Sequence, residues 1–417
     1  MSDPPRRTSV RRAANDHTIS TLARATFGGV LAAAMAVSVF GRGAFGILSP
    51  ILIAEMSLTR AQIGWLVTAF ALTGAVLSPA AGRFVDAVGG RLALITVFGL
   101  SAIGMFAVAA SPTYLLLVVA SLVAGLGQAT ANPATNKAIA QQVPVGRRGV
   151  ITGIKQSGVQ IGIVLGGIFL PVGAATLGWR PTMALAGVAA CIIGVVAHLS
   201  TGADPVSDTA VATPRRREPI PADTIWLSLY GFIMGAVGGA LLTYVPLFAE
   251  ERIGFTVAAA GIVVAMIGAA GVVGRIVWGH FSERLTHFGR ALVWMGILSA
   301  VSTLLIWAGE VWGGPALWLG AALNGASAQS WMAVGMLATM ATAGHAATGR
   351  ASGIVVLGFL AGQAAGPPAF GYAVDATGLY DAAMLGTTIA SLLSAGLALV
   401  WMRGAGTSRR KSYGLST

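Results

Sequence analysis

Long apolar runs, bounded by charged residues or by Pro and Gly, recur along the whole chain of 417 residues. Each run approaches the roughly 20 residues that an α-helix needs to cross a bilayer. A membrane β-barrel would instead show ten-residue segments of alternating polarity, and the sequence has no such pattern. The pattern therefore predicts an all-α membrane protein of twelve transmembrane helices. The predicted helices are 27–53, 62–81, 92–110, 113–138, 150–172, 180–199, 225–248, 257–280, 290–308, 315–340, 351–373 and 382–402.

These runs form two groups of six, divided by the polar stretch STGADPVSDTAVATPRRREPIPAD at 200–223. Its composition is typical of a flexible linker. The apolar segment after the basic N-terminus is too long and too glycine-rich for a cleaved signal peptide. We therefore expect five parts. They are a tail (1–26), a first six-helix half (27–199), the linker (200–223), a second six-helix half (224–402) and a C-terminal tail (403–417).

Composition and charge agree with a membrane protein. The chain is 55% hydrophobic and 10% charged, whereas soluble domains carry about 25% charged residues. A net charge of +12 would suggest nucleic acid in a soluble protein, but most of the 26 Lys and Arg residues fall on one side of the predicted topology. The positive-inside rule then places both termini in the cytoplasm of a cell inner-membrane protein, with lipid and not nucleic acid as the partner. The single cysteine, Cys191, allows no disulfide framework and is expected to pack between helices.

The two halves repeat a short motif. The second helix ends in AGRFVDAVGGR (81–91) and the eighth in WGHFSERLTHFGR (278–290), so Gly82 with Asp86 matches Gly279 with Glu283. Later in each half, GGIFLPVG and AGPPAFG occupy corresponding places. Duplicated six-helix halves are typical of transporters that bind substrate between their repeats.

On these residues the chain resembles the major facilitator superfamily, over roughly 25 to 402. The resemblance implies the major facilitator fold and a gating role for the paired loop motif. Asp86 and Glu283 would pair with basic residues or cap helix ends across the halves. Ala87 stands where a basic residue is common. The motif residues are Gly82, Asp86, Gly89 and Arg91 in the first half and Gly279, Glu283, Arg284 and Arg290 in the second.

Longer segments are similar to the branch that holds oxalate/formate exchangers and monocarboxylate carriers. They are GRGAFGILSPILIAEMSLTRAQIGWLVTAF (41–70), RRGVITGIKQSG (147–158) and GRIVWGHFSER (274–284), and cyanate-permease-like proteins share parts of them. The resemblance implies that Arg275 binds a substrate carboxylate. Many animal monocarboxylate carriers place an acid one turn earlier, where this chain has Gly271.

Four ionisable residues fall within predicted spans: Arg42, Lys137, Lys155 and Arg275. Such residues are costly in a bilayer and by default indicate a functional site. No Asp or Glu is predicted beside them, so the membrane interior is expected to be cationic. A water-filled cavity that receives an anion would relieve both their repulsion and their desolvation.

Depth suggests which cations act together. Lys155 lies ~10 Å past Arg148, and Arg275 ~12 Å before Glu283, at 1.5 Å per residue. In the fold that the resemblance implies, the fifth and eighth helices face each other, so the two cations would meet at the interface of the halves. Arg42 lies about 20 Å from its helix start and would serve the other side of the same cavity. The alternatives are structural. Lys155 and Lys137 would snorkel to the surface. Arg42 would pair with an acid at a helix end such as Glu55, and Arg275 would only cap backbone carbonyls or pair with a motif acid such as Asp86.

Polar residues extend this candidate substrate site. Gln128, Asn132 and Asn136 recur every four residues and form one face of the fourth helix. Asn324 and Gln329 belong to the tenth helix, which corresponds to the fourth in the repeat. Hydrogen bonding between helices is the alternative role. Tyr244 is a candidate hydroxyl donor or a residue of the interfacial aromatic belt.

The sequence thus predicts a monomeric secondary carrier for a small organic anion, of the monocarboxylate type. It would work by alternating access, with a co-transported proton or an exchanged anion. The sequence has no Walker-type loop, so we expect no nucleotide site and no other cofactor. The predicted spans contain no constellation of catalytic residues, so we do not expect an enzyme. Alternatives are a drug or metabolite exporter, a cyanate or inorganic-anion permease, and a transporter-like membrane sensor.

Overall fold

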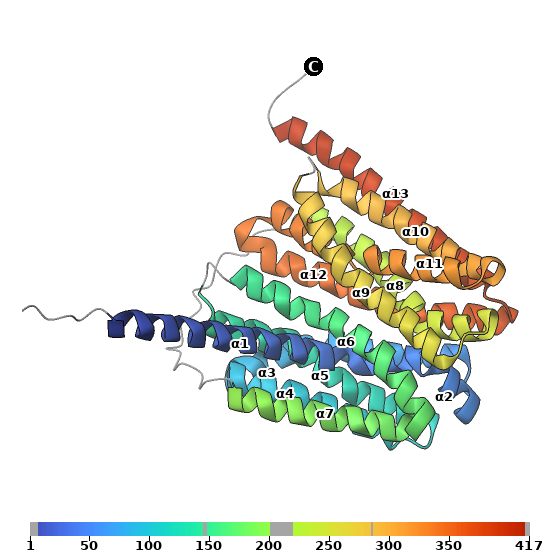
Figure 1. The fold of residues 1–417 in the computed structure, drawn as a ribbon. Coiled ribbons are helices and arrows are strands. Elements are labelled where there is room, and N and C mark those ends of the chain that lie inside the picture. The colour runs from blue at the N-terminus through green and yellow to red at the C-terminus, as the bar shows by residue number, and fades with distance from the viewer. Residues whose placement is uncertain (1–6, 145–147, 201–219, 285–286, 413–417) are drawn as a thin grey trace, which may run out of the picture.

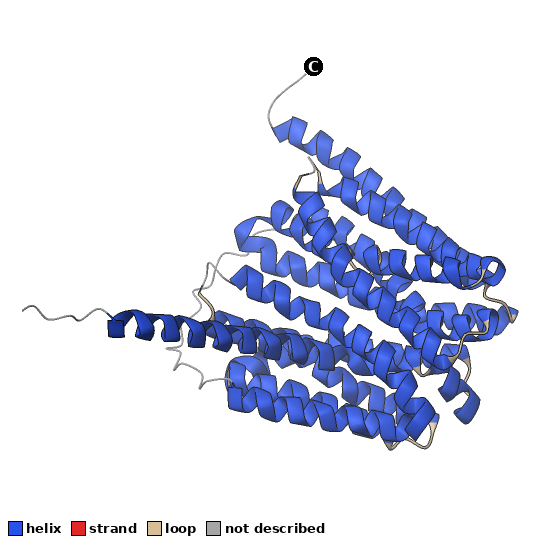
Figure 2. Ribbon diagram, in the orientation of Figure 1, coloured by secondary structure: helices blue, strands red, loops and turns tan. Residues whose placement is uncertain are grey.

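The computed structural model describes residues 7–144, 148–200, 220–284 and 287–412. All regular secondary structure within these ranges is helical (Figure 2). The helices are α1 (Arg7–Ile47), α2 (Ser49–Met56), α3 (Arg60–Val88), α4 (Gly90–Ala109), α5 (Tyr114–Gln142), α6 (Arg148–Leu177), α7 (Trp179–Ser200), α8 (Asp223–Ile253), α9 (Val257–Glu283), α10 (Phe288–Trp312), α11 (Gly314–Ala326), α12 (Trp331–Thr377) and α13 (Asp381–Ser412).

Most predicted spans correspond to one helix, and the differences have local causes. The first span is divided at Leu48, and Pro50, which lacks an N–H, lies in the first turn of α2. The predicted N-terminal tail is helical from Arg7, where α1 begins. Of the predicted linker, residues 201–219 lie outside the described residues.

The tenth predicted span is also divided, between α11 and α12. Ser327 and Ser330 donate their hydroxyls to the carbonyls of Leu323 and Gly325. Serine side chains that bond nearby backbone in this way compete with the regular helical hydrogen bonds. The helix therefore breaks at 327–330, in the middle of the apolar run. The prediction of one continuous helix over 315–340 was wrong at this point.

Helix α12 supplies two spans. A straight helix would place Trp331 and Phe359 roughly 40 Å apart, yet their ring centroids lie 5.5 Å from each other. Both residues also lie beside α8, at Gly231 and Gly235 respectively. The helix therefore turns back between them, and the tenth and eleventh predicted spans run antiparallel.

Helix ends lie where the sequence supplies caps. Thr59 forms a capping box with Gln62 at the start of α3, and Thr256 accepts the Ala259 N–H at the start of α9. Gly254 ends α8 at φ 78°, a left-handed conformation that glycine adopts without strain. The two threonine caps explain why α3 and α9 begin within two residues of their predicted starts, at Arg60 and Val257.

The helices form two groups, α1–α7 and α8–α13, packed side by side (Figure 1). Between the groups α3 packs on α12, α6 on α9 and α1 on α8. Glycines permit these contacts: a Cβ on Gly64 would lie 2.5 Å from the backbone of Pro368, and one on Gly46 would lie 2.8 Å from the Thr243 Cα. We call the two ends of the bundle the Arg60 end and the Asp86 end. In Figure 1 the two groups converge at the right, which is the Arg60 end, and diverge at the left.

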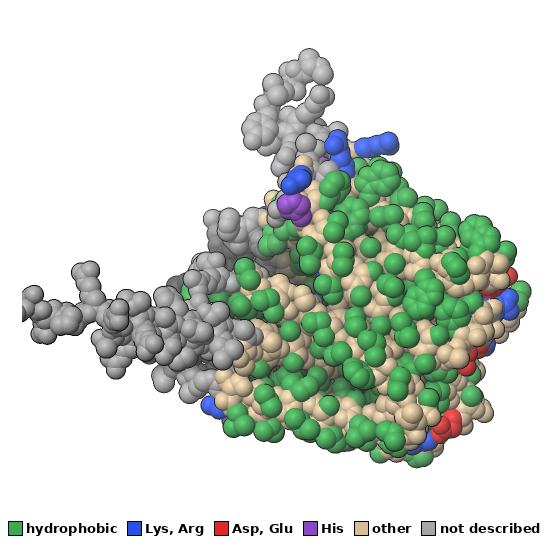
Figure 3. Space-filling model, viewed as in Figure 1, with side chains coloured by type: hydrophobic (Ala, Val, Ile, Leu, Met, Phe, Trp, Pro, Cys, Tyr) green, Lys and Arg blue, Asp and Glu red, His purple; other side chains and the backbone are tan. Residues whose placement is uncertain are grey.

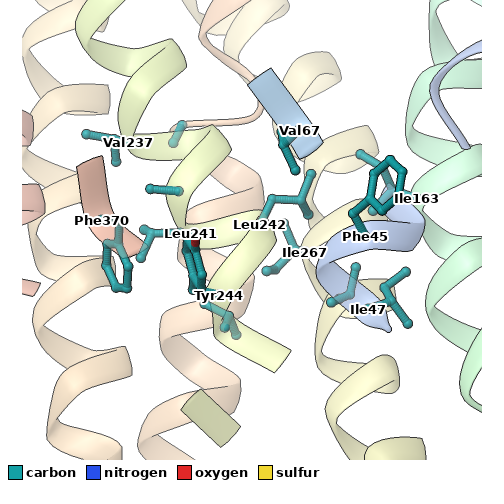
Figure 4. Packing of buried hydrophobic residues seen from close by; sticks show 14 of the residues in the cluster. Phe45, Ile47, Val67, Ile163, Val237, Leu241, Leu242, Tyr244, Ile267 and Phe370 are labelled. Atoms are coloured by element: carbon teal, nitrogen blue, oxygen red, sulfur yellow. The ribbon is translucent and has the colours of Figure 1, made fainter. Parts of the chain in front are cut away.

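One hydrophobic core joins the two groups. Phe45 of α1, Val67 of α3 and Ile163 of α6 belong to the same buried cluster as Leu242 of α8 and Ile267 of α9 (Figure 4). Since the cluster crosses the interface, the two groups form one packed body in this state.

The surface is that of a membrane protein. Hydrophobic side chains cover most of the face seen in Figure 3, and charged side chains lie at its margins. Within the described residues, 11 helical segments are long and apolar enough to cross a membrane, and α11 with the first part of α12 supplies the divided span. The predicted all-α, multi-pass architecture is confirmed.

Candidate functional site

Ion pairs in the described part of the chain lie toward the two ends of the bundle. Five such contacts occur, and the acids are Glu55, Asp86, Glu251, Glu310 and Asp375. None of these acids contacts Arg42, Lys155 or Arg275. The middle of the bundle therefore contains cations whose described partners are neutral.

Lys137 differs from the other three cations. Its Nζ lies 3.1 Å from Asp86 Oδ1, so the expectation that no acid accompanies the cations of the spans was wrong for this residue. Lys137 belongs to α5 and Asp86 to α3, and both helices lie in the first half. The pair therefore joins neighbouring helices of one half, and it leaves Asp86 unavailable as the alternative partner for Arg275.

Lys155 of α6 is 1% exposed. Its Nζ donates to Asn136 Oδ1 of α5 at 2.6 Å. Asn136 is itself exposed, so Lys155 lies one side chain beneath the surface of the bundle. The ammonium group is held by a neutral amide and does not snorkel to the surface.

Arg275 of α9 reaches across to the other half. Its Nη1 donates to the carbonyl of Gln156, the residue after Lys155, at 3.1 Å. Its Nε and Nη2 donate to the Gln329 carbonyl in the α11–α12 break, at 3.4 and 3.3 Å. The guanidinium thus holds two backbone carbonyls, one from each half, and has no described carboxylate partner.

Arg42 of α1 is buried and donates through Nη1 to Gln363 Oε1 of α12. Its Nε has no hydrogen-bond partner among the described residues. The alternative partner Glu55 instead contacts Arg180 and Trp179. Arg42 and Gln363 therefore form a second contact between the halves that joins a cation to a neutral amide.

The depths of the three cations follow from helix register. Arg275 and Lys155 are at one level, since Arg275 bonds the residue next to Lys155. Along α1 and α6, Gly162 packs on Ala36, so Arg42 lies roughly 20 Å farther toward the Arg60 end than Lys155. A small molecule that contacts Arg275 and Lys155 cannot contact Arg42 at the same time.

The predicted polar residues are distributed over this region. Gln128 is half-buried and Asn132 is exposed, on the same face of α5 as Asn136. Asn324 of α11 is fully buried, and neither polar atom of its side chain has a described partner. Gln329 donates from Nε2 to the Gly238 carbonyl of α8.

Tyr244 lies apart from these residues, in a cluster that closes the Arg60 end. Arg60 of α3 contacts Glu251 of α8 at 2.7 Å and Asp375 of α12 at 3.7 Å. Tyr244 donates its hydroxyl to the Arg60 carbonyl, and Tyr380 donates to Glu251. We call these five residues the Arg60 cluster. All contacts of Arg60 in it cross between the halves.

Asp375 also caps the first turn of α3. The backbone N–H groups of Arg60 and Ala61 donate to its carboxylate at 3.1 and 2.8 Å. A carboxylate is favoured at a helix N-terminus, where N–H groups are unpaired and the dipole is positive. Burial raises the pKa of the Tyr380 phenol, and the Glu251 carboxylate adds to the rise. Tyr380 therefore stays a neutral donor, and the cluster fixes the halves together at this end.

The loop-motif residues lie at the opposite end. Gly89 separates α3 from α4. Its φ of 83° is one that only glycine adopts without strain. Arg91 donates to the His198 carbonyl. Arg284 ends α9 and is exposed, Gly82 and Gly279 have open space at their Cα atoms, and the Glu283 side chain lies outside the described residues.

A comparison with protein families decides the class of protein. The family model of the Major Facilitator Superfamily matches residues 31–347. The chain belongs to this superfamily. It is therefore a multi-pass membrane transporter by family, and the resemblance noted from the loop motif is confirmed.

Individual relatives of this facilitator have low sequence identity to it, but the matched region covers most of each relative's length. A probable sulfoacetate transporter of Cupriavidus necator is 25% identical over 387 residues, which cover 85% of this chain and 88% of that one. A hexuronate transporter of Bacillus subtilis is 22% identical, with 66% and 70% covered. A solved bacterial homolog of the human lysosomal transporter Spinster, inward-facing and occupied, has a TM-score of 0.75 at 18% identity, with 91% and 97% covered. That likeness shows the fold.

The structure adds to this facilitator's candidate site several residues that the sequence analysis did not select. Gln160 and Gln363 are polar residues inside apolar spans, and that signal would have identified them. Glu251, Asp375 and Tyr380 lie at helix ends, where polar residues are ordinary. Their role follows only from the contact with Arg60 across the interface.

For the Asp86 motif we expect a kinetic effect. Asp86→Asn should slow transport by the facilitator up to about fivefold, since an exposed ion pair contributes up to ~1 kcal/mol, and should leave ligand affinity unchanged. Lys137→Gln removes the same 3.1 Å contact and should match it. Uptake rates and equilibrium binding in proteoliposomes measure the two quantities. Loss of binding with unchanged turnover in Asp86→Asn would identify Asp86 as a ligand residue instead.

Proposed function

We propose that the protein is a secondary transporter of small organic anions, of the monocarboxylate type or close to it. The observation that supports this most is the set of neutral partners around three cations in the middle of the bundle, of which Arg42 and Lys155 are buried and Arg275 is half-buried. Arg42, Lys155 and Arg275 bond only to amide and backbone oxygens among the described residues. Drug exporters for cations would need the opposite charge in this region.

The energetic argument concerns what neutral oxygens can do for a cation. A buried charge is costly unless a counter-charge and hydrogen bonds replace its water. Amide and carbonyl oxygens satisfy the N–H groups of these side chains but do not neutralise them. An anion that enters from water neutralises them, so a negatively charged substrate would stabilise these side chains more than a neutral or positive one.

Two relatives support the same charge. The proteins from Cupriavidus necator and Bacillus subtilis are named for sulfoacetate and hexuronate, and both compounds are anions that carry a carboxylate. Their identity to this chain is low, so they support the class of substrate and not a particular compound.

Arg275 and Lys155 are the proposed primary ligands. They come from different halves and lie at one depth, so one carboxylate between them would be bound by both halves at once. Arg275 would exchange a backbone carbonyl for the carboxylate, and Lys155 would exchange Asn136 Oδ1. Gln128, Asn132 and Asn324 would bind the remainder of the substrate or its water, and Arg42 would hold the anion at a second depth.

Alternating access would use the two ends of the bundle. The Arg60 cluster closes one end, and the halves diverge toward the Asp86 end (Figure 1). We propose that the Asp86 end faces the cytoplasm with both termini, that the protein acts as a monomer in the inner membrane, and that the loop motif closes that end in the other state. Since no acid contacts the three cations in the described part of the chain, a proton would travel on the substrate or on Lys155, or one anion would exchange for another.

Competition for uptake tests the charge of the substrate. Proteoliposomes that contain the purified protein are loaded with a small carboxylate, and exchange of labelled carboxylate is measured. We expect unlabelled carboxylates to compete and organic cations to have no effect. Transport of cations or neutral sugars alone would contradict the proposal. The Arg275→Gln variant is the control, since it removes the proposed charge and keeps a polar side chain; its folding is checked by its elution from a size-exclusion column.

A further inference from the structure

Gln160 of α6 is a polar residue that the proposed binding of a carboxylate does not use. Its side chain is fully buried, at 0% exposure. Neither Oε1 nor Nε2 has a hydrogen-bond partner among the described residues. Buried amides are nearly always bonded, because a lost partner leaves the desolvation of the group uncompensated. An amide without partners on either side is therefore a place where a ligand or a water belongs.

The position of Gln160 relates it directly to Arg275. Gln156 and Gln160 are four residues apart on α6, and Arg275 and Gly271 are four apart on α9, so each pair shares a helix face. Arg275 contacts the Gln156 carbonyl, and Gly271 faces the Gln160 amide. Gln160 thus lies one helical turn beyond the Arg275 contact, toward the Arg60 end.

Gly271 provides the space that the amide occupies. A Cβ on residue 271 would lie 3.0 Å from both Cδ and Oε1 of Gln160 and 3.2 Å from Nε2. A Cβ at 271 would therefore shift the amide by a few tenths of an ångström, and a larger side chain would displace it. The amide of Gln160 on one half therefore occupies space that Gly271 on the other half leaves open.

Other glutamines at this interface serve as a comparison. Gln329 donates from Nε2 to the Gly238 carbonyl, and Gln363 accepts from Arg42. Each therefore has a partner that explains its burial. Gln160 is equally buried, and both of its polar atoms lack a partner among the described residues, as do those of Asn324.

We propose that Gln160 is a specificity-determining residue, whose amide hydrogen-bonds a second oxygen-bearing group of the transported anion. The proposal rests on the proposed function, in which Arg275 and Lys155 hold the carboxylate. Because the amide is one turn from the Arg275 contact, the second group belongs to a carbon adjacent to or one removed from the carboxylate. The substrate class is thus a short carboxylate with a hydroxyl, keto or acidic oxygen, and the amide can donate to it or accept from it.

Matched pairs of anions test this inference. Lactate with propionate, and sulfoacetate with acetate, differ in the second oxygen-bearing group. Inhibition constants against labelled carboxylate uptake are measured for the wild type and for Gln160→Leu, which keeps the volume and removes both polar atoms. We expect the wild type to prefer the oxygen-bearing member of at least one pair by ~10-fold or more. In Gln160→Leu the preference should disappear, and the affinity for the plain carboxylate should be unchanged.

Two further variants keep the outcomes distinct. Gly271→Val places a larger side chain against the amide from the other side of the interface and should also abolish the preference. Gln62→Leu changes a glutamine at the Arg60 end and should keep it. Equal effects of Gln160→Leu on both members of each pair would overturn the inference and indicate a structural amide or a bound water. A wild type that binds no carboxylate would overturn the proposed function as well, whereas Arg275-dependent binding without a Gln160 effect would overturn only this inference.

Discussion

Replacing Arg275 with Lys weakens anion binding by on the order of 1.5–3 kcal/mol, the range of a charge-assisted hydrogen bond. The substitution keeps the charge, but Lys lacks the planar fork that matches a carboxylate at two points. The structure sharpens this expectation, because three nitrogens of Arg275 already hold two carbonyls from opposite halves. Isothermal calorimetry with the transported anion measures the effect.

The Lys155→Gln variant completes the test. It should cost a similar amount if Lys155 contacts the anion, and almost nothing if its bond to Asn136 is all that it does. The double variant then separates the possibilities, because two residues that share one partner couple, whereas independent ones add. Strict additivity of the two free-energy changes would contradict a shared carboxylate.

Removing the Arg60 side chain shifts the equilibrium between the two access states. Arg60→Ala loses two ion pairs across the halves, with Glu251 and Asp375, at side-chain exposures of 28% or less. It also loses a contact of the guanidinium with the Tyr380 ring. Together these contribute roughly 1–2 kcal/mol, so the population open at the Arg60 end should rise by about 5–30-fold.

Spin-label distances measure this population. Labels on Ala54→Cys and Leu379→Cys, in a Cys191→Ser background, lie on exposed positions of the two halves near Arg60. Double electron–electron resonance should show a longer distance gaining weight in Arg60→Ala. Arg252→Ala is the matched control, since its pair with Glu310 lies within the second half. The same distribution in both variants would show that the Arg60 cluster does not hold this end closed.

The candidate site was predictable in part. The three cations and the α5 face were visible in the sequence because a polar residue in an apolar run is conspicuous and costly. Their partners were not visible. Arg42 bonds Gln363 at a separation of 321 residues, and Arg60 bonds Asp375 at 315. No local pattern specifies such pairs, since they depend on how two helix groups pack.

The sequence by itself determined the membrane class, the two six-helix halves and the presence of Arg42, Lys155 and Arg275 in the interior. The physical reason is that burial in a bilayer requires about 20 apolar residues in a row, which is a local property of the chain. Tertiary structure decided the rest. It paired Lys137 with Asp86, divided the tenth span at Ser327 and joined the halves at Arg60. These outcomes depend on helix register and on close approach at residues such as Gly64 and Gly271, where contacts form between segments far apart in sequence.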